Sequence, residues 1–306
     1  RYKYIASLIL VLAIAESVLV FSQHAGLVPF LWNDIYLESY GGFLSGALGP
    51  NKINLGMNMF FSFIFATGLL LQKHLKVNRI LVIVALLASL ATIGVSGSRT
   101  TYLALIVFVC YLFVSSTKKF FGLSIIISLG VIVAFFFNLE FIEAITSTIE
   151  NRVVNKVSNP GIFTGESLDV GDLYEDLGAG RKQLSVRYFY YLIENPLIIP
   201  FGIGLNNRLL IQFSAHNIYL SLINEVGLVG LFLYFKWLTN YLYLRFGKAK
   251  PLKTVLNGLI LAMLVTLFFG EHLYIYRSLF TILGYFLLIV VMLIVPRYYF
   301  TNVKSK

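Results

Sequence analysis

Long apolar stretches, separated by short polar segments, dominate the pattern of this chain. The first covers residues 5–21, and others recur as far as residue 295. Most approach the ~20 residues that an α-helix needs to cross a bilayer. The pattern predicts eight membrane-spanning helices, at Ile5–Phe21, Leu55–Leu71, Ile80–Val95, Thr101–Val114, Phe120–Phe137, Asn217–Phe235, Leu256–Gly270 and Leu279–Val295.

Composition supports the membrane assignment. The 306 residues are 58% hydrophobic and 12% charged, with a mean hydropathy of +0.82. A soluble domain of this length could not bury so much apolar surface. We therefore expect an all-α, polytopic integral membrane protein whose residues 1–306 form a single transmembrane domain. The single cysteine, Cys110, lies within a predicted span, which excludes a disulfide framework.

Lys and Arg are distributed unevenly between the predicted loops. With Arg1 in the cytoplasm, the N-terminal segment, alternate loops and the C-terminal tail together hold 15 of the 24 Lys and Arg and no acid, whereas the opposite segments hold 12 of the 14 acids. This is the positive-inside pattern, so we expect both termini on the cytoplasmic side of the inner (plasma) membrane. The net charge of +10 then acts at the cytoplasmic leaflet, and no basic–aromatic motif indicates nucleic-acid binding.

Arg99 is a basic residue on the predicted outer side, against this bias. It lies in the short link Ser96–Thr100 between two spans. A guanidinium held there would lie at the level of lipid headgroups, and its planar fork suits bidentate binding of phosphate oxygens. The alternative is an interfacial Arg that snorkels to ordinary lipid phosphates.

The long outer segment, residues 138–215, is predicted to form a small folded cap over the site, because structureless loops of this length are uncommon. Within it, Arg181–Pro196 is typical of a short helix that Asn-Pro ends. Its aromatic residues suggest contact with the bilayer surface, with Arg187 directed at a headgroup. Arg181 lies six positions earlier and competes for the same role.

The segment after this helix holds further polar candidates. Gly202-Ile203-Gly204 favours a tight turn over a phosphate loop, because no strand precedes it. His216 is predicted in the first turn of the next helix, whose positive end favours the neutral imidazole that a general base requires. An interfacial polar residue or a helix cap is the alternative. Glu225, about two turns further along an apolar span, either supports this site or makes a helix-packing hydrogen bond. The histidines lack metal-ligand spacing, so no metal or other cofactor is expected.

Three features in this order resemble the bacterial O-antigen ligase and polymerase superfamily. They are Ser96-Gly97-Ser98-Arg99 entering an apolar helix, Asn195-Pro196 followed by Gly202-Ile203-Gly204-Leu205-Asn206-Asn207, and His216-Asn217 leading to Asn224-Glu225-Val226-Gly227. The resemblance implies a GT-C-like membrane glycosyltransferase, inverting and metal-independent, that takes a glycan from undecaprenyl diphosphate on the outer face of the inner membrane. Members usually have more than eight helices, so we expect this chain to lack N-terminal helices.

The resemblance also implies roles for individual residues. His216 would activate the acceptor hydroxyl, and Arg99 and Arg187 would hold the donor diphosphate. Supporting positions fall to Arg181, Asn217 and Glu225. The implied partners are an undecaprenyl diphosphate-linked oligosaccharide, an acceptor glycan or lipid-linked glycan, and membrane lipids.

Two activities within this superfamily stay open. A polymerase of O-antigen, capsule or exopolysaccharide uses a second lipid-linked glycan as acceptor, whereas a ligase transfers the glycan to lipid A core or to protein. A chain rich in Lys, Asn, Ile and Tyr favours the polymerase, because it suggests an AT-rich organism without an outer membrane. A transporter or flippase for the same lipid-linked sugar is a further alternative. It would be expected to place charges near the membrane midplane, often in repeated halves.

Overall fold

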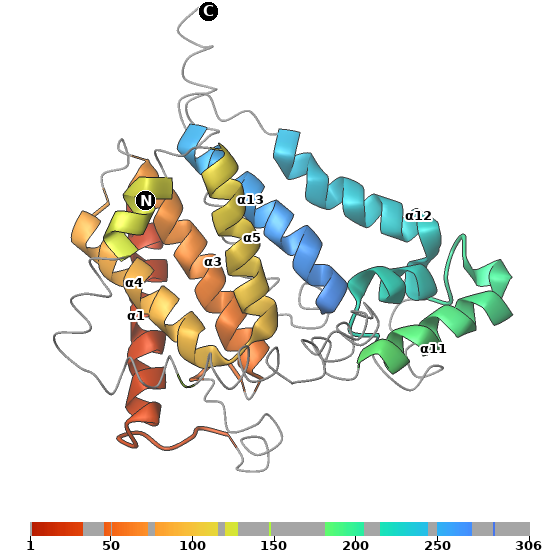
Figure 1. The fold of residues 1–306 in the computed structure, drawn as a ribbon, viewed down its shortest axis with the longest axis horizontal. Coiled ribbons are helices and arrows are strands. Elements are labelled where there is room, and N and C mark those ends of the chain that lie inside the picture. The colour runs from red at the N-terminus through yellow and green to blue at the C-terminus, as the bar shows by residue number, and fades with distance from the viewer. Residues whose placement is uncertain are drawn as a thin grey trace, which may run out of the picture.

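The computed structural model describes residues 2–32, 46–49, 51–72, 77–115, 120–127, 147, 181–204, 215–243, 250–270 and 284. Regular structure in these ranges is entirely helical, as predicted, and most of the long helices stand side by side (Figure 1). The helices are α1 Tyr2–His24, α3 Lys52–Leu71, α4 Arg79–Ser96, α5 Arg99–Ser115, α11 Arg181–Glu194, η2 Pro196–Ile198, α12 Ile218–Asn240, η4 Tyr241–Tyr243, α13 Lys250–Thr266 and η5 Leu267–Phe269.

Five helices in the described part of the chain are long and apolar enough to cross a membrane. They cover Lys3–His24, Lys52–Leu71, Arg79–Ser96, Ile218–Tyr243 and Pro251–Phe269, each of which corresponds to a predicted span. α5 is a shorter apolar helix of 17 residues at a sixth predicted position. The predicted spans Phe120–Phe137 and Leu279–Val295 lie mostly outside the described residues, so the total of eight stays a prediction.

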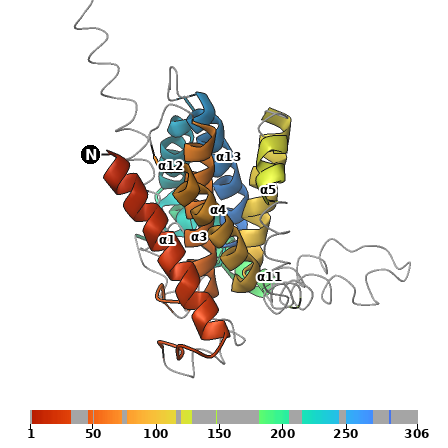
Figure 2. The same ribbon diagram turned by 90° about the vertical axis from the view of Figure 1, so that its left-hand side faces the viewer.

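α3 lies at the centre of the bundle and is buried along most of its length. α4 packs along it most extensively, α13, α5 and α1 pack against it as well, and α1 also packs on α4 (Figure 2). The Phe108 ring of α5 meets Phe60 and Phe63 of α3 edge to face, with ring centroids 6.3 and 6.1 Å apart. Hydropathy alone could not identify α3 as the central helix, because lipid and protein interior select the same apolar side chains.

Asparagine side chains cap the first turns of α3, α4 and α12. The side-chain oxygens of Asn51, Asn78 and Asn217 each accept a hydrogen bond from the amide two residues on, at 2.9–3.0 Å. Such caps satisfy amides that the helix itself cannot pair.

Neighbouring helices run in alternating directions, so α3, α5 and α12 begin at one end of the bundle, the lower end in Figure 1. We call this the site end.

α12 is two helical segments that meet at Gly227, and not the uninterrupted span predicted for Asn217–Phe235 (Figure 1). Gly227 has φ 68° and ψ −173°, outside the helical region. Tyr219 in the first segment stacks on Phe235 in the second, with ring centroids 5.1 Å apart. In a straight helix these residues, 16 positions apart, would be separated by about 24 Å. The first segment therefore folds back toward the second.

Candidate active site

Arg99 is the first residue of α5 and follows the two-residue link Gly97-Ser98 that ends α4. Gly97 has φ 63° and closes α4 in the left-handed conformation. Ser98 then holds the first turn of α5. Its carbonyl accepts from the amides of Thr101 and Tyr102 at 3.0 Å, and its Oγ accepts from the Thr101 hydroxyl at 2.8 Å. The tight link predicted around Arg99 is confirmed.

The link is anchored on α3 through Gly56. A Cβ at this position would lie 2.4 Å from Thr101 Oγ1 and 3.1 Å from Ser98 Cβ, so a larger residue would push the link away. Ser98 and Thr101 are buried as a result, and Arg99 between them is half-buried. The Arg99 side chain therefore extends from backbone that packing holds in place.

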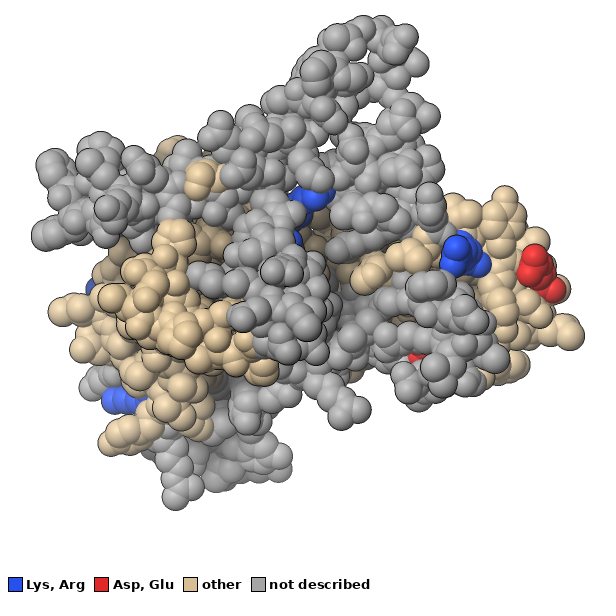
Figure 3. Space-filling model, turned by 90° about the horizontal axis from the view of Figure 1, so that it is seen from below, with Lys and Arg blue, Asp and Glu red and all other residues tan. Residues whose placement is uncertain are grey.

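The charge of Arg99 lies where a helix least favours a cation. The N-terminal amides of a helix carry positive partial charge, which disfavours a cation there by about 0.3–1 kcal/mol. α3 and α12 begin at the same end of the bundle as α5. Figure 3 views the molecule from below and shows basic side chains near the middle of this face and, separately, toward its α11 side. The site end thus favours an anionic ligand such as a phosphate.

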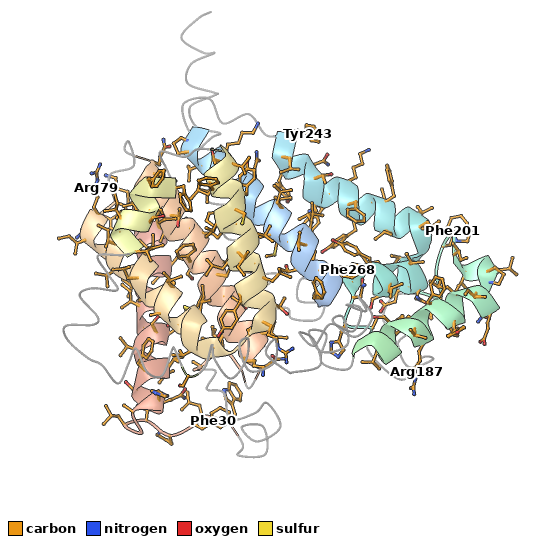
Figure 4. The ribbon with its side chains drawn as sticks, viewed as in Figure 1. Phe30, Arg79, Arg187, Phe201, Tyr243 and Phe268 are labelled. Atoms are coloured by element: carbon orange, nitrogen blue, oxygen red, sulfur yellow. The ribbon has the colours of Figure 1, made fainter. Side chains whose placement is uncertain are left out.

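α11 carries Arg187 and ends before Asn195-Pro196, as predicted. α11 packs against α12, and its buried side chains Tyr188 and Leu192 lie one turn apart on a single face. Arg187 is exposed and, in Figure 4, is directed away from α12. The helix thus buries an apolar stripe and leaves Arg187 exposed.

A hydrogen bond connects α11 to the segment that carries His216. Ser185 Oγ donates to the carbonyl oxygen of Ala215 at 3.5 Å. Ser185 lies two residues before Arg187, and Ala215 directly precedes His216. Arg187 and His216 therefore belong to one local unit. The side chain of Arg181 lies outside the described part of the structure, so its role stays a prediction.

The structure corrects the predicted position of His216. α12 begins at Ile218 with Asn217 as its N-cap, so His216 precedes the helix and does not lie in its first turn. The φ of His216 is 50°, and every other residue with positive φ in the described ranges is a glycine. Left-handed backbone costs about 1–2 kcal/mol for a non-glycine residue. It persists where neighbouring contacts enforce it, and such strain clusters at functional sites.

Residues 199–204 close the break in α12 with backbone hydrogen bonds on both sides of Gly227. The bonds are Ile203 N–H to Asn224 O (2.9 Å), Gly204 N–H to Glu225 O (2.9 Å), Leu228 N–H to Ile199 O (2.8 Å) and Val229 N–H to Pro200 O (3.3 Å). They satisfy the last carbonyls of the first segment and the first amides of the second, which the break removes from the helical pattern. Unsatisfied groups of this kind cost several kcal/mol in a bilayer. We call this arrangement the clasp.

Two glycines make the clasp possible. A Cβ on Gly202 would lie 2.3 Å from the carbonyl carbon of Glu225, and one on Gly227 would lie 2.2 Å from the carbonyl oxygen of Pro200. Both glycines also have positive φ, 73° and 68°. The tight turn predicted for Gly202-Ile203-Gly204 is confirmed. Its three amides all donate to backbone carbonyls, so they are not directed at a phosphate.

The first segment of α12 carries a buried polar stripe beside His216. Its members are each at most 3% exposed: Asn217, Ser221, Asn224 and Glu225. Asn217 accepts from the amides that begin the helix, and the backbone of Glu225 belongs to the clasp, so these two of the three predicted supporting residues connect the site to its scaffold. Ser221 and Asn224 were not predicted. Their spacing from Asn217, four and seven residues, is the signal that would have found them.

Comparison with known protein families identifies a match over the part of the chain that contains these residues. Residues 83–235, half of the chain, match the family described as O-Antigen ligase. The chain belongs to the O-antigen ligase family. The matched residues run from α4 to the second segment of α12, so they contain Arg99, Arg187, His216 and both sides of the clasp. No curated protein and no solved structure matches the chain.

Membership of the O-antigen ligase family confirms the resemblance predicted from the motifs. Together with the five apolar helices, it identifies an integral membrane protein with an O-antigen ligase or polymerase type of function. Proteins of the O-antigen ligase family are glycosyltransferase-like enzymes that act on lipid-linked glycans.

Proposed function

We propose that this protein is an inverting, metal-independent glycosyltransferase that polymerises a surface polysaccharide at the outer face of the inner membrane. The donor glycan is carried by undecaprenyl diphosphate, and the acceptor is a sugar hydroxyl of a second lipid-linked glycan. In this proposal the site end is extracytoplasmic, both termini are cytoplasmic, and residues 138–215 form a cap over the site.

The placement of His216 carries the proposal. Its backbone is left-handed, it directly precedes the cap of α12, and the preceding residue is hydrogen-bonded to the helix that bears Arg187. Arg99 opens α5 at the same end of the bundle. A potential base and two cations in this setting match the needs of glycosyl transfer from a diphosphate.

In the proposed reaction His216 accepts the proton of the acceptor hydroxyl as the hydroxyl oxygen bonds to the anomeric carbon of the donor. The bond from that carbon to the diphosphate oxygen breaks, and the diphosphate leaves with the electron pair. Arg99 and Arg187 bind its phosphate oxygens and offset the negative charge that develops on them. Inversion places the attacking oxygen and the leaving group on opposite sides of the sugar, so His216 acts across the substrate from the arginines.

A gel assay tests this proposal on the full-length protein in liposomes, with an undecaprenyl diphosphate-linked oligosaccharide as sole substrate. We expect a ladder of longer glycans that persists in EDTA. His216→Ala should lower its rate by about 10²–10⁴-fold, the usual contribution of a general base. Arg99→Ala should also lower the rate. The exposed Arg79 lies at the opposite end of α4 (Figure 4), so Arg79→Ala serves as the matched control and should retain activity.

The same assay separates the competing activities. If glycan is transferred only after lipid A core or a protein acceptor is added, the protein is a ligase and not a polymerase. Movement of the lipid-linked sugar across the vesicle without new glycosidic bonds would overturn the enzymatic proposal in favour of a transporter. A full ladder from folded His216→Ala protein would remove His216 from the role of base.

A further inference from the structure

α11 and the loop that follows it expose a row of large apolar side chains. The row consists of Val186, Phe189, Tyr190, Ile193, Leu197 and Phe201. Leu197 is 92% exposed and Phe201 is 76% exposed. The four positions within α11 follow the spacing i, i+3, i+4 and i+7, so they share one side of the helix. A contiguous apolar surface of this kind marks an interaction surface.

This row is continuous with a surface that faces lipid. Leu197 and Phe201 flank the two residues, Ile199 and Pro200, that pair with the start of the second segment of α12 in the clasp. That segment belongs to a candidate membrane span. Its own exposed apolar side chains are Leu228, Val229, Phe232 and Leu233. Because acyl chains cover such side chains in a membrane span, the neighbouring row of α11 and its loop extends the lipid-facing surface.

The charges and the orientation of α11 point to the same partner. Its residues include Arg181, Lys182 and Arg187 but only one acid, Glu194. Figure 4 shows Arg187 and Phe201 on opposite sides of α11. Phe201 lies on the side of the second segment of α12. Figure 1 shows α11 lying crosswise to that segment and to α13. A basic helix rich in aromatic residues, crosswise to spans, fits the boundary between headgroups and acyl chains.

We propose that α11 and the following loop form a membrane anchor whose apolar row enters the hydrocarbon edge of the leaflet at the site end. Phe189, Ile193, Leu197 and Phe201 contact acyl chains, and Arg187 stays at the level of the headgroups. The clasp joins this anchor to α12, and Ser185 joins it to the segment before His216. The anchor thereby sets the depth at which Arg187 and His216 meet a lipid-linked substrate, a consequence that rests on the proposed function.

Spin-label accessibility tests the anchor. Single cysteines are introduced into a Cys110→Ala background by Leu197→Cys and Phe201→Cys, labelled with a nitroxide, and reconstituted in phosphatidylethanolamine–phosphatidylglycerol vesicles. Oxygen, which concentrates in hydrocarbon, and a water-soluble nickel chelate are the two collision reagents. Phe232→Cys is the lipid-facing reference, and Glu194→Cys is the reference at the polar level.

We expect the oxygen-to-nickel collision ratio at both positions to match that at Phe232→Cys and to exceed that at Glu194→Cys several-fold. A ratio equal to that at Glu194→Cys would place the row in water and overturn the proposal. Low collision with both reagents would show that protein, such as a second copy of the chain, covers the row, and would also overturn it. The Phe189→Cys variant gives an independent position if one labelled variant does not fold. The measurement needs no turnover, so its result is separable from that of the glycan assay.

Discussion

α3 and α12 both begin at the site end with an asparagine cap, yet they are held in different ways. α3 is a continuous helix that side chains of α4, α5 and α13 cover over most of its length. α12 is interrupted at Gly227, and backbone hydrogen bonds from residues 199–204 complete it. Packing of apolar side chains is enough to build the centre of the bundle. Placing His216 requires a non-helical turn, which a membrane protein tolerates only where other protein groups satisfy the backbone.

The largest effect is expected from Gly227→Ala. The new Cβ would collide with the carbonyl of Pro200, so the four bonds of the clasp would be lost or distorted. At about 1 kcal/mol each, these bonds predict a loss of about 4 kcal/mol in the free energy of unfolding. Thermal unfolding in detergent measures the effect. Gly122→Ala is the control, because a Cβ at Gly122 meets open space; an unchanged midpoint for Gly227→Ala would show that the break does not need glycine.

Phe63→Ala is the corresponding change at the centre of α3. The Phe63 ring is buried and meets Phe108 edge to face. Removing such a buried ring typically costs about 3 kcal/mol or more of unfolding free energy. The fraction that remains folded should keep its turnover rate, because the change lies outside the site. Phe232→Ala, at an exposed position of α12, should change the midpoint little. Equal midpoints for the two variants would contradict the central role of α3.

Two caps of the same chemistry distinguish stability from site geometry. Asn217→Ala and Asn78→Ala each remove a side-chain bond to the first amides of a helix, and each should cost about 1 kcal/mol. Only Asn217 adjoins His216, so Asn217→Ala should also lower the rate of glycan transfer. The rates of both variants are compared at matched folded fractions. Equal activity would mean that the cap does not position His216.

The smallest effect is expected from Tyr219→Phe. It removes the hydrogen bond from the Tyr219 hydroxyl to the carbonyl of Leu264 in α13 but keeps the ring stacked on Phe235. A loss of about 0.5–1 kcal/mol in the unfolding free energy should follow. Tyr243→Phe, at an exposed position, is the matched control and should leave the unfolding midpoint unchanged. A loss as large as that of Gly227→Ala would mean that this bond, and not the clasp, holds the fold-back.

The sequence predicted the described helices, the link before Arg99, the end of α11 and the turn at Gly202 because each has a local signal. Apolar stretches, glycine and Asn-Pro each influence backbone conformation within a few residues of their own position. Gly227 alone does not identify the break, since Gly56 and Gly68 lie inside the continuous helix α3. The partner segment of the break lies more than 20 residues earlier and contributes mainly backbone groups. For the same reason His216 was assigned to a helical turn that begins only after it.

The amino-acid sequence alone identifies an all-helical membrane protein, locates its apolar helices and assigns it to the O-antigen ligase family. About 20 apolar residues in a bilayer can satisfy their backbone only as a helix, so hydropathy is sufficient for the class and for the positions of the helices. The family follows from the match over residues 83–235. The folded chain was needed to show that α3 is central, that α12 folds back and that His216 lies in strained backbone beside α11. Lipid and protein interior favour the same side chains, and the backbone hydrogen bonds of the clasp constrain residue type only at Gly202 and Gly227.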